Sequence, residues 1–338
     1  MDVEKRVGSQ TVKLKDPPKI ISAFSVVGHK EGEGPLKDYF DFVLSDDTLG
    51  QESYERAESE MMYTAIKEAI KKANLKEEDI NYLFAGDLLN QIISSSFAAR
   101  KFNIPFFGLY GACSTMSESL SLASLIMDGG YAEHVVASTS SHFSSAERQY
   151  RFPLDYGSQR AKTAQRTVTG SGAMVLGKTG DYPKVTYVTT GVVKDYGIKD
   201  PNNMGAAMAP AAAHTIYTHL KDTGRKPEDY DIIATGDLGN VGREITKELI
   251  KEYGYDMSEN YVDCGSLIFY DEEQKTDSGG SGCGCSAVVS TGYFYKKLMK
   301  REVKKVLLVS TGALLSTTSS LQGESIPGIA HAVSIEID

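Results

Sequence analysis

Cys113 is the residue whose neighbours best equip it for chemistry. It stands in the small-residue run 111–115, between an apolar run (104–109) and a segment with helical spacing (117–128) that ends at two glycines. Strand, tight turn and helix is the simplest interpretation of that order. The N–H groups and the dipole at a helix N-terminus favour a thiolate or bind an anion. Cys113 is therefore either a nucleophile or anion-binding residue, or one of the many cysteines that only fill space in a core.

Four further side chains complete the candidate ligand-binding site. His142 ends an apolar run, His331 lies in the last loop, and Asp87 and Asn90 follow a predicted strand. A small anion needs N–H donors, a helix terminus and His or Arg, so we expect Cys113, His142 and His331 to converge. Asp87 suits an anion if it is protonated, hydrogen-bonded, or close to a calcium ion. The alternative is structural: histidines that satisfy core hydrogen bonds and an aspartate that serves a turn.

Other chemistry-bearing residues carry less information. Cys283 and Cys285 have a spacing found in metal sites, but no fitting further pair of ligands follows, so no metal is expected. The arginine-rich stretch 148–166 is typical of a solvated loop. The remaining histidines have no motif and are taken as structural: His29, His134, His214 and His219.

Length and composition exclude several classes of protein. The chain has 338 residues, 41% of them hydrophobic and 24% charged, which is ordinary for a globular protein. A formal net charge of -9 argues against general nucleic-acid binding. Four unevenly placed cysteines indicate a reduced compartment and no disulfide framework. The start has no signal-peptide core, and no apolar run approaches the roughly 18 residues that span a bilayer.

The elements that must position Cys113 form two similar series. The sequence around Asp87 recurs around Asp237, and Cys113-Ser114 recurs at Cys285 with the serine that follows it. The second spacing is longer, so the second copy carries an insertion near 255–275. Expected strands are 82–85, 134–142, 184–193 and 232–235, and expected helices are 52–74, 94–103 and 208–220.

These ordered matches predict a duplicated α/β fold with an N-terminal half, 1–180, and a C-terminal half, 181–338. Two sheets then face each other across a helical layer and are related by a pseudo-dyad. Cys113 and Cys285 are expected to be pseudo-equivalent residues.

Several runs, taken together, carry a resemblance to a known family. They are 85–91, 110–115, 140–142, 146–149, 168–173, 208–213, 279–283 and 311–316. The chain resembles the thiolase/ketoacyl synthase superfamily, whose fold is thiolase-like: a duplicated five-layer α-β-α-β-α arrangement. Within it, the resemblance narrows to the stage V sporulation protein AD (SpoVAD) family. That resemblance implies a homodimer at the spore inner membrane, beside other SpoVA membrane proteins, that helps to move dipicolinic acid (pyridine-2,6-dicarboxylate) into the spore.

The chain departs from the superfamily where catalysis would need a base. Condensing relatives pair the cysteine with His or Asn side chains that move protons and hold an oxyanion. The matching stretches here, 236–240 and 279–285, contain no histidine. We therefore expect non-catalytic binding of dipicolinic acid, free or as its calcium chelate, for uptake into the developing spore, with no other cofactor. The alternatives are an acyltransferase or condensing enzyme that uses Cys113, and a structural scaffold for membrane partners.

Overall fold

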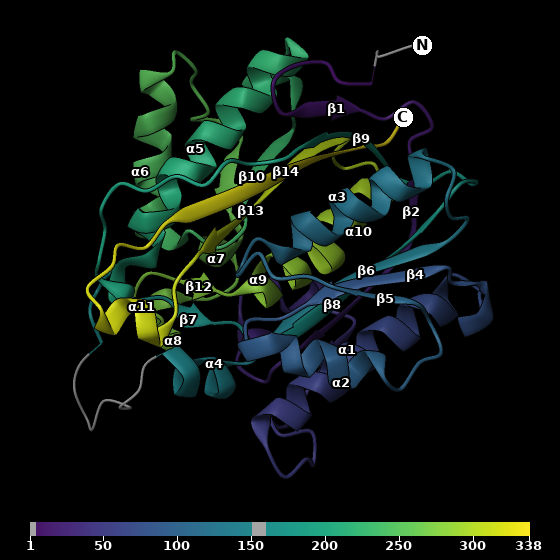
Figure 1. Ribbon diagram of the computed structural model, residues 1–338, viewed down its shortest axis with the longest axis horizontal. Coiled ribbons are helices and arrows are strands. Elements are labelled where there is room, and N and C mark those ends of the chain that lie inside the picture. Colours follow the sequence, from purple (N-terminus) through teal and green to yellow (C-terminus); the bar gives the residue numbers. More distant parts are fainter. Residues whose placement is uncertain (1–4, 151–159) are drawn as a thin grey trace.

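Helices and strands stack in five layers in the computed structural model, which describes residues 5–150 and 160–338 (Figure 1). Helices α1 and α2 cover one face, α5 and α6 cover the opposite face, and α3, α9 and α10 lie between two blocks of strands. The expected α-β-α-β-α order is confirmed. The main helices are α1 (Tyr54–Lys72), α2 (Ile93–Ala99), α3 (Thr115–Asp128), α5 (Met204–Thr223), α6 (Gly239–Glu252), α9 (Cys283–Val288) and α10 (Tyr295–Met299).

The two strand blocks have the same internal pairing. The first is β2 (Lys19–Val27), β8 (Gly170–Gly177), β6 (Val135–Ser141), β4 (Tyr82–Gly86) and β5 (Phe106–Gly108). The second is β9 (Lys184–Thr189), β14 (Gly328–Glu336), β13 (Lys305–Ala313), β10 (Ile232–Thr235) and β11 (Tyr261–Asp263). In each block, two parallel pairings at the outer edge are followed by two antiparallel ones. The two blocks therefore correspond to the two copies of the repeat seen in the sequence.

The blocks join at one place. Strand β9 pairs with β2 only through Lys184 and Lys19, which makes a 12-stranded sheet of the two blocks and their additions. The additions are β1 (Thr11–Lys13) beside β9 and β3 (Phe42–Val43) beside β2. The division into halves 1–180 and 181–338 stays a prediction, and β1 crosses it.

Helix α3 is buried over most of its surface because it packs on both blocks. It contacts β4 and β6 on one side and β13 and β14 on the other. Two of its buried serines have hydrogen-bond partners: Ser117 Oγ donates to Ser310 Oγ on β13 at 2.8 Å, and Ser124 Oγ donates to the Leu120 carbonyl. A helix surrounded by strands gives fixed positions to the residues at its start.

The solvated loop expected over 148–166 is wrong at its start, because residues 148–150 end a helix, α4 (Phe143–Tyr150), whose Ser145, Ala146 and Glu147 are buried. A short amphipathic helix of two turns has too few apolar positions to be recognised from its spacing. Residues 151–159 of that stretch lie outside the described residues. The remaining short elements are β7 (Arg166–Thr167), β12 (Gly280–Ser281), α7 (Cys264–Leu267), α8 (Asp271–Gln274) and α11 (Thr317–Leu321).

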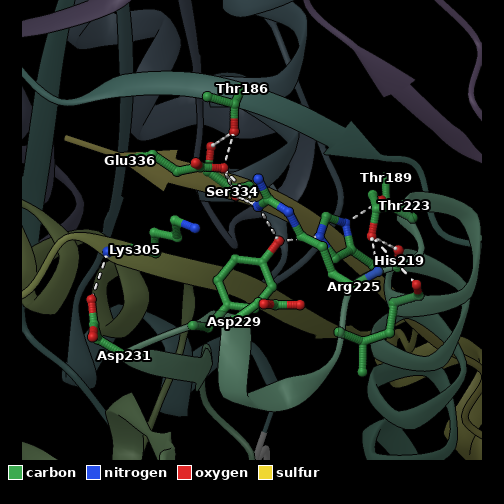
Figure 2. Close-up of polar contacts among 12 residues, drawn as sticks. Thr186, Thr189, His219, Thr223, Arg225, Asp229, Asp231, Lys305, Ser334 and Glu336 are labelled. Atoms are coloured by element: carbon green, nitrogen blue, oxygen red, sulfur yellow. Dashed lines mark hydrogen bonds and ion pairs between the residues drawn. The ribbon is translucent and has the colours of Figure 1, made fainter. Parts of the chain in front are cut away.

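A buried polar network holds α5 against the second block (Figure 2). His219 on α5 bonds Thr189 Oγ1 on β9 through Nδ1 at 2.8 Å and the Tyr230 hydroxyl through Nε2 at 2.6 Å. Arg225 donates to the same hydroxyl at 2.8 Å and pairs with Glu336 on β14 at 2.7 Å. The pair is four-fifths buried or more, so each charge depends on the other.

Glu336→Gln is expected to lower the free energy of unfolding by about 2 kcal/mol, because Arg225 then loses its charged acceptor. Asp338→Asn is the matched control, since Asp338 pairs with Lys184 at 2.9 Å but is 92% exposed. The control is expected to cost no more than about 0.5 kcal/mol. Urea unfolding measures both, and equal effects contradict this account of the network.

Candidate functional site

Cys113 lies in the turn between β5 and α3, as the sequence predicts. Ala112 takes a left-handed conformation (φ 50°), and its carbonyl accepts a hydrogen bond from Thr115 Oγ1 at 2.7 Å. The same hydroxyl accepts from the Gly111 N–H at 3.1 Å, which closes the turn. Cys113 is 6% exposed and directly precedes Ser114, the residue that caps α3.

Asp237 is the ionisable neighbour of the thiol. Its carboxyl forms a side-chain hydrogen bond with Cys113, and it also accepts from Thr311 Oγ1 at 2.6 Å and the Gly282 N–H at 2.9 Å. Burial, and then the charge of Asp237, hold the pKa of the Cys113 thiol well above its ordinary value. The thiol is therefore protonated at neutral pH, whereas a nucleophilic cysteine is held beside a cation or a base.

Cys283 shares the surroundings of Cys113. Both belong to a small apolar cluster with Leu88 and Ala146, and Cys283 Sγ donates to the Ser140 carbonyl at 2.9 Å. Cys285, which the sequence repeat matches to Cys113, packs instead in the main core. Within the described part of the chain, no group of three His, Cys, Asp or Glu side chains is arranged to hold a metal ion.

Asp87 is fully buried and holds the chain that follows β4. It accepts from the Leu89 N–H at 2.8 Å and from both the N–H and the hydroxyl of Ser95. Burial raises its pKa. Glu58 lies close behind, bonded by Ser140 and Ser145, and burial followed by the charge of Asp87 raises its pKa as well. Asp87 thus serves the turn in the free protein.

The two histidines do not converge on Cys113. His142 Nδ1 accepts from the Ser144 N–H at 3.1 Å, so its Nε2–H donates to the Asp47 carbonyl at 2.8 Å. His331 was expected in the last loop but lies within strand β14, opposite Ser310 of β13, and its Nδ1 accepts from the Gly191 N–H at 3.2 Å. Burial lowers the pKa of both, to about 4 for His331, so both are neutral. Neither lines the cavity beside the thiol. Their ligand roles, like that of Asp87, stay predictions.

Two neighbouring spaces lie at this place, and Tyr150 and Leu315 line both of them. The cavity that reaches Cys113 has about 30 Å³, room for about two water molecules. Outside it lies an open cleft of about 370 Å³, the outer cleft, and Asn90 is among its lining residues. The other polar side chains of the outer cleft are Gln91, Tyr110, Gln149, Tyr150, Ser316 and Thr317.

Sequence reasoning missed the two tyrosines and the carboxyl beside the thiol. Tyr110 stands three residues before Cys113, and Tyr150 closes α4, so neither has a spacing that marks a site. Asp237 carried a signal, since it lies in the stretch where condensing relatives keep a histidine. Its repeat of Asp87 suggested a turn residue instead.

Comparison with known proteins places the chain among sporulation proteins. The family model for stage V sporulation protein AD (SpoVAD) matches residues 8–336. Stage V sporulation protein AD of Bacillus subtilis (strain 168) is 47% identical over 332 residues, which cover 98% of each chain.

Solved structures of condensing enzymes share the fold. 3-Oxoacyl-[acyl-carrier-protein] synthase III from Aquifex aeolicus VF5 is 15% identical, with a TM-score of 0.57 over 94% of this chain and 99% of its own. A variant of OleA from Xanthomonas campestris with cerulenin is 13% identical, with a TM-score of 0.61 over 95% of this chain and 96% of its own. The thiolase-like fold is therefore confirmed. Among the helices that the structure describes, none combines the length and apolar character needed to cross a membrane.

Two buried carboxyls make stability depend on pH. Burial raises the pKa of Glu31 and of Asp263 to about 7. The folded chain then keeps protons that the unfolded chain has already lost, so this stability is present at low pH and is lost as pH rises through 7. Burial lowers the pKa of His219 to about 3 and that of His331 to about 4, which acts in the opposite direction only below the ordinary histidine value near 6.5.

The melting temperature is therefore expected to fall as pH rises from 6.5 to 8. Glu31→Gln removes one of these groups and is expected to flatten the profile, while Glu33→Gln, an exposed neighbour on the same turn, leaves it unchanged. Thermal denaturation followed by circular dichroism measures the profile. A melting temperature that rises over this range contradicts the assignment.

Proposed function

The chain belongs to the stage V sporulation protein AD (SpoVAD) family and so has a role in sporulation, and from this premise we propose that it binds dipicolinic acid for uptake into the developing spore. In this proposal it works at the spore inner membrane beside other SpoVA membrane proteins. The observation that carries the proposal is the outer cleft, an open space lined by uncharged side chains next to a cysteine that is not activated for catalysis.

The outer cleft suits the calcium chelate better than the free acid. Among the described residues that line it, none carries a formal charge. Free dipicolinate is a dianion at neutral pH, and taking it out of water needs positive partners. Its one-to-one calcium complex has no net charge. Calcium takes six to eight oxygen ligands, and the amide oxygens of Asn90 and Gln91 and the hydroxyls of Ser316 and Thr317 offer several beyond those of the acid.

The ligand residues divide by position. Asn90 lies in the outer cleft, where we propose direct contact, and Cys113 lies at the inner end of the site. Asp87, His142 and His331 are proposed to act as positioning residues, because each bonds the backbone of a neighbouring segment.

Acyl transfer by Cys113 is the alternative, and the shared fold of the condensing enzymes favours it. The geometry argues against it. The Cys113 thiol is held protonated, and the one carboxyl among the described residues that line its cavity, that of Glu147, pairs with Arg160 at 3.5 Å. Neither neutral histidine lines the thiol cavity.

A homodimer is the proposed assembly. Strand β5 ends the first block, and within the described chain its outer edge pairs with no strand. Phe107 on β5 is 49% exposed and Phe97 on α2 is 38% exposed, which is unusual for aromatic side chains that meet only water. An open strand edge with apolar side chains fits the same edge of a second copy around a two-fold axis.

Isothermal calorimetry is expected to show dipicolinate binding that is at least tenfold tighter with equimolar calcium. Asn90→Ala is expected to weaken it about tenfold, because the calcium ion loses one oxygen ligand. Asn103→Ala, exposed and outside the cleft, is the matched control.

Absence of both binding heat and a thermal shift with dipicolinate would contradict the binding proposal and favour the structural scaffold. A Cys113 acyl adduct that forms from acetyl-CoA and turns over, seen by intact mass, would establish the enzyme instead.

Light scattering is expected to give twice the chain mass of 36.7 kDa. Phe107→Glu places a charge at the proposed interface and is expected to give monomers. Tyr131→Glu changes a ring that is 73% exposed elsewhere and is expected to leave the dimer intact. A wild-type protein that is monomeric at micromolar concentration would contradict the proposed homodimer.

A further inference from the structure

One aromatic side chain separates the outer cleft from the thiol cavity. Tyr150 lines both the cleft of about 370 Å³ and the cavity of about 30 Å³ that contains Cys113. Leu315 is the other residue common to the two linings. The ring of Tyr150 therefore stands at the passage by which any molecule in the cleft would reach the thiol.

Hydrogen bonds fix Tyr150 in this place. Its hydroxyl donates to the Leu88 carbonyl and lies 3.0 Å from the Tyr110 hydroxyl. Gln149, its neighbour on α4, donates to the same carbonyl at 3.1 Å and accepts from the Asn90 N–H at 2.9 Å. The last turn of α4 is thus bonded to the cleft wall, which we define as residues 88–92.

The cleft wall is strained at its far end. Gln91 and Ile92 both have positive φ, 56° and 48°, and the left-handed region is unfavourable for a β-branched residue such as Ile92. Such a backbone persists only where its surroundings hold it. Hydrogen bonds to the side chains of Gln149, Tyr150 and Asp87 hold the three residues directly before the strained pair, 88–90.

We infer that Tyr150 is an access latch: its bond to the Leu88 carbonyl keeps the passage shut, and breaking that bond joins the outer cleft to the Cys113 cavity. A cavity of two waters then becomes the inner end of one larger site. The latch controls which small, flat ligands reach the start of α3. The identity of that ligand rests on the proposed function, whereas the latch belongs to the free protein.

Iodoacetamide labelling of Cys113, followed by peptide mass spectrometry at pH 8.5 without ligand, tests the latch. Tyr150→Phe keeps the ring but removes the bond, and we expect labelling at least tenfold faster than in the wild type. Tyr110→Phe keeps the bond to Leu88 and is expected to stay within twofold of the wild type. Tyr131→Phe, on a distant exposed ring, is the control for the substitution itself.

The latch is overturned if Tyr150→Phe labels at the wild-type rate, or if Tyr110→Phe accelerates labelling as much. Circular dichroism and the melting temperature confirm that each variant is folded. The outcome is separable from the proposed function. Faster labelling of Tyr150→Phe with no dipicolinate heat keeps the latch and removes the function, and the reverse pair of results keeps the function and removes the latch.

Discussion

The meeting of the two halves at one buried carboxyl is the constraint on which the rest of this site depends. Asp237 follows β10, and its bonds reach Thr311 on β13, the N–H of Gly282 before α9, and the thiol of Cys113 before α3. A carboxyl out of water needs these partners, so the three segments that supply them are fixed relative to the end of β10. Burial raises the pKa of Asp237, and burial followed by the charge of Asp237 raises the pKa of the Cys113 thiol. The thiol is therefore held in its protonated form, which is a poor nucleophile for acyl chemistry.

The fold could be predicted because the sequence contains two similar series of elements. The recurrence of the Asp87 sequence at Asp237 marks two strands that end alike, and α3 follows from the helical spacing after Cys113. The long buried strands are apolar over most of their length, which their sequences show directly. Helix α4 was not predictable, since Phe143–Tyr150 is short and polar on most of its surface. Its place is set by contacts with the cleft wall that no local pattern records.

The candidate site was predictable only in part. Cys113 and Asn90 lie at the cavity and the outer cleft, as a motif next to a strand end should. His142 and His331 were chosen for their chemistry, but both ring nitrogens of His142 and the Nδ1 of His331 are occupied by backbone groups at 2.8 to 3.2 Å. The sequence identifies a side chain, but it does not show which group that side chain will hydrogen-bond to in the folded protein. Tyr150 is the opposite case, an ordinary residue that matters because of where α4 ends.

The single residue pair that joins the two strand blocks affects how rigid the sheet is. Lys19 and Lys184 form the one residue pair that joins β2 to β9. The sheet therefore consists of two well-paired strand blocks with a weak junction between them. A junction of one residue pair resists bending weakly. Rigidity between the two blocks comes from α3 and α9, because both helices contact strands of both blocks. Cys113 directly precedes Ser114 at the start of α3, and Asp237, which follows β10, accepts from the Gly282 N–H at the start of α9. A change in the angle between the two blocks would therefore act on the place where the thiol meets the carboxyl.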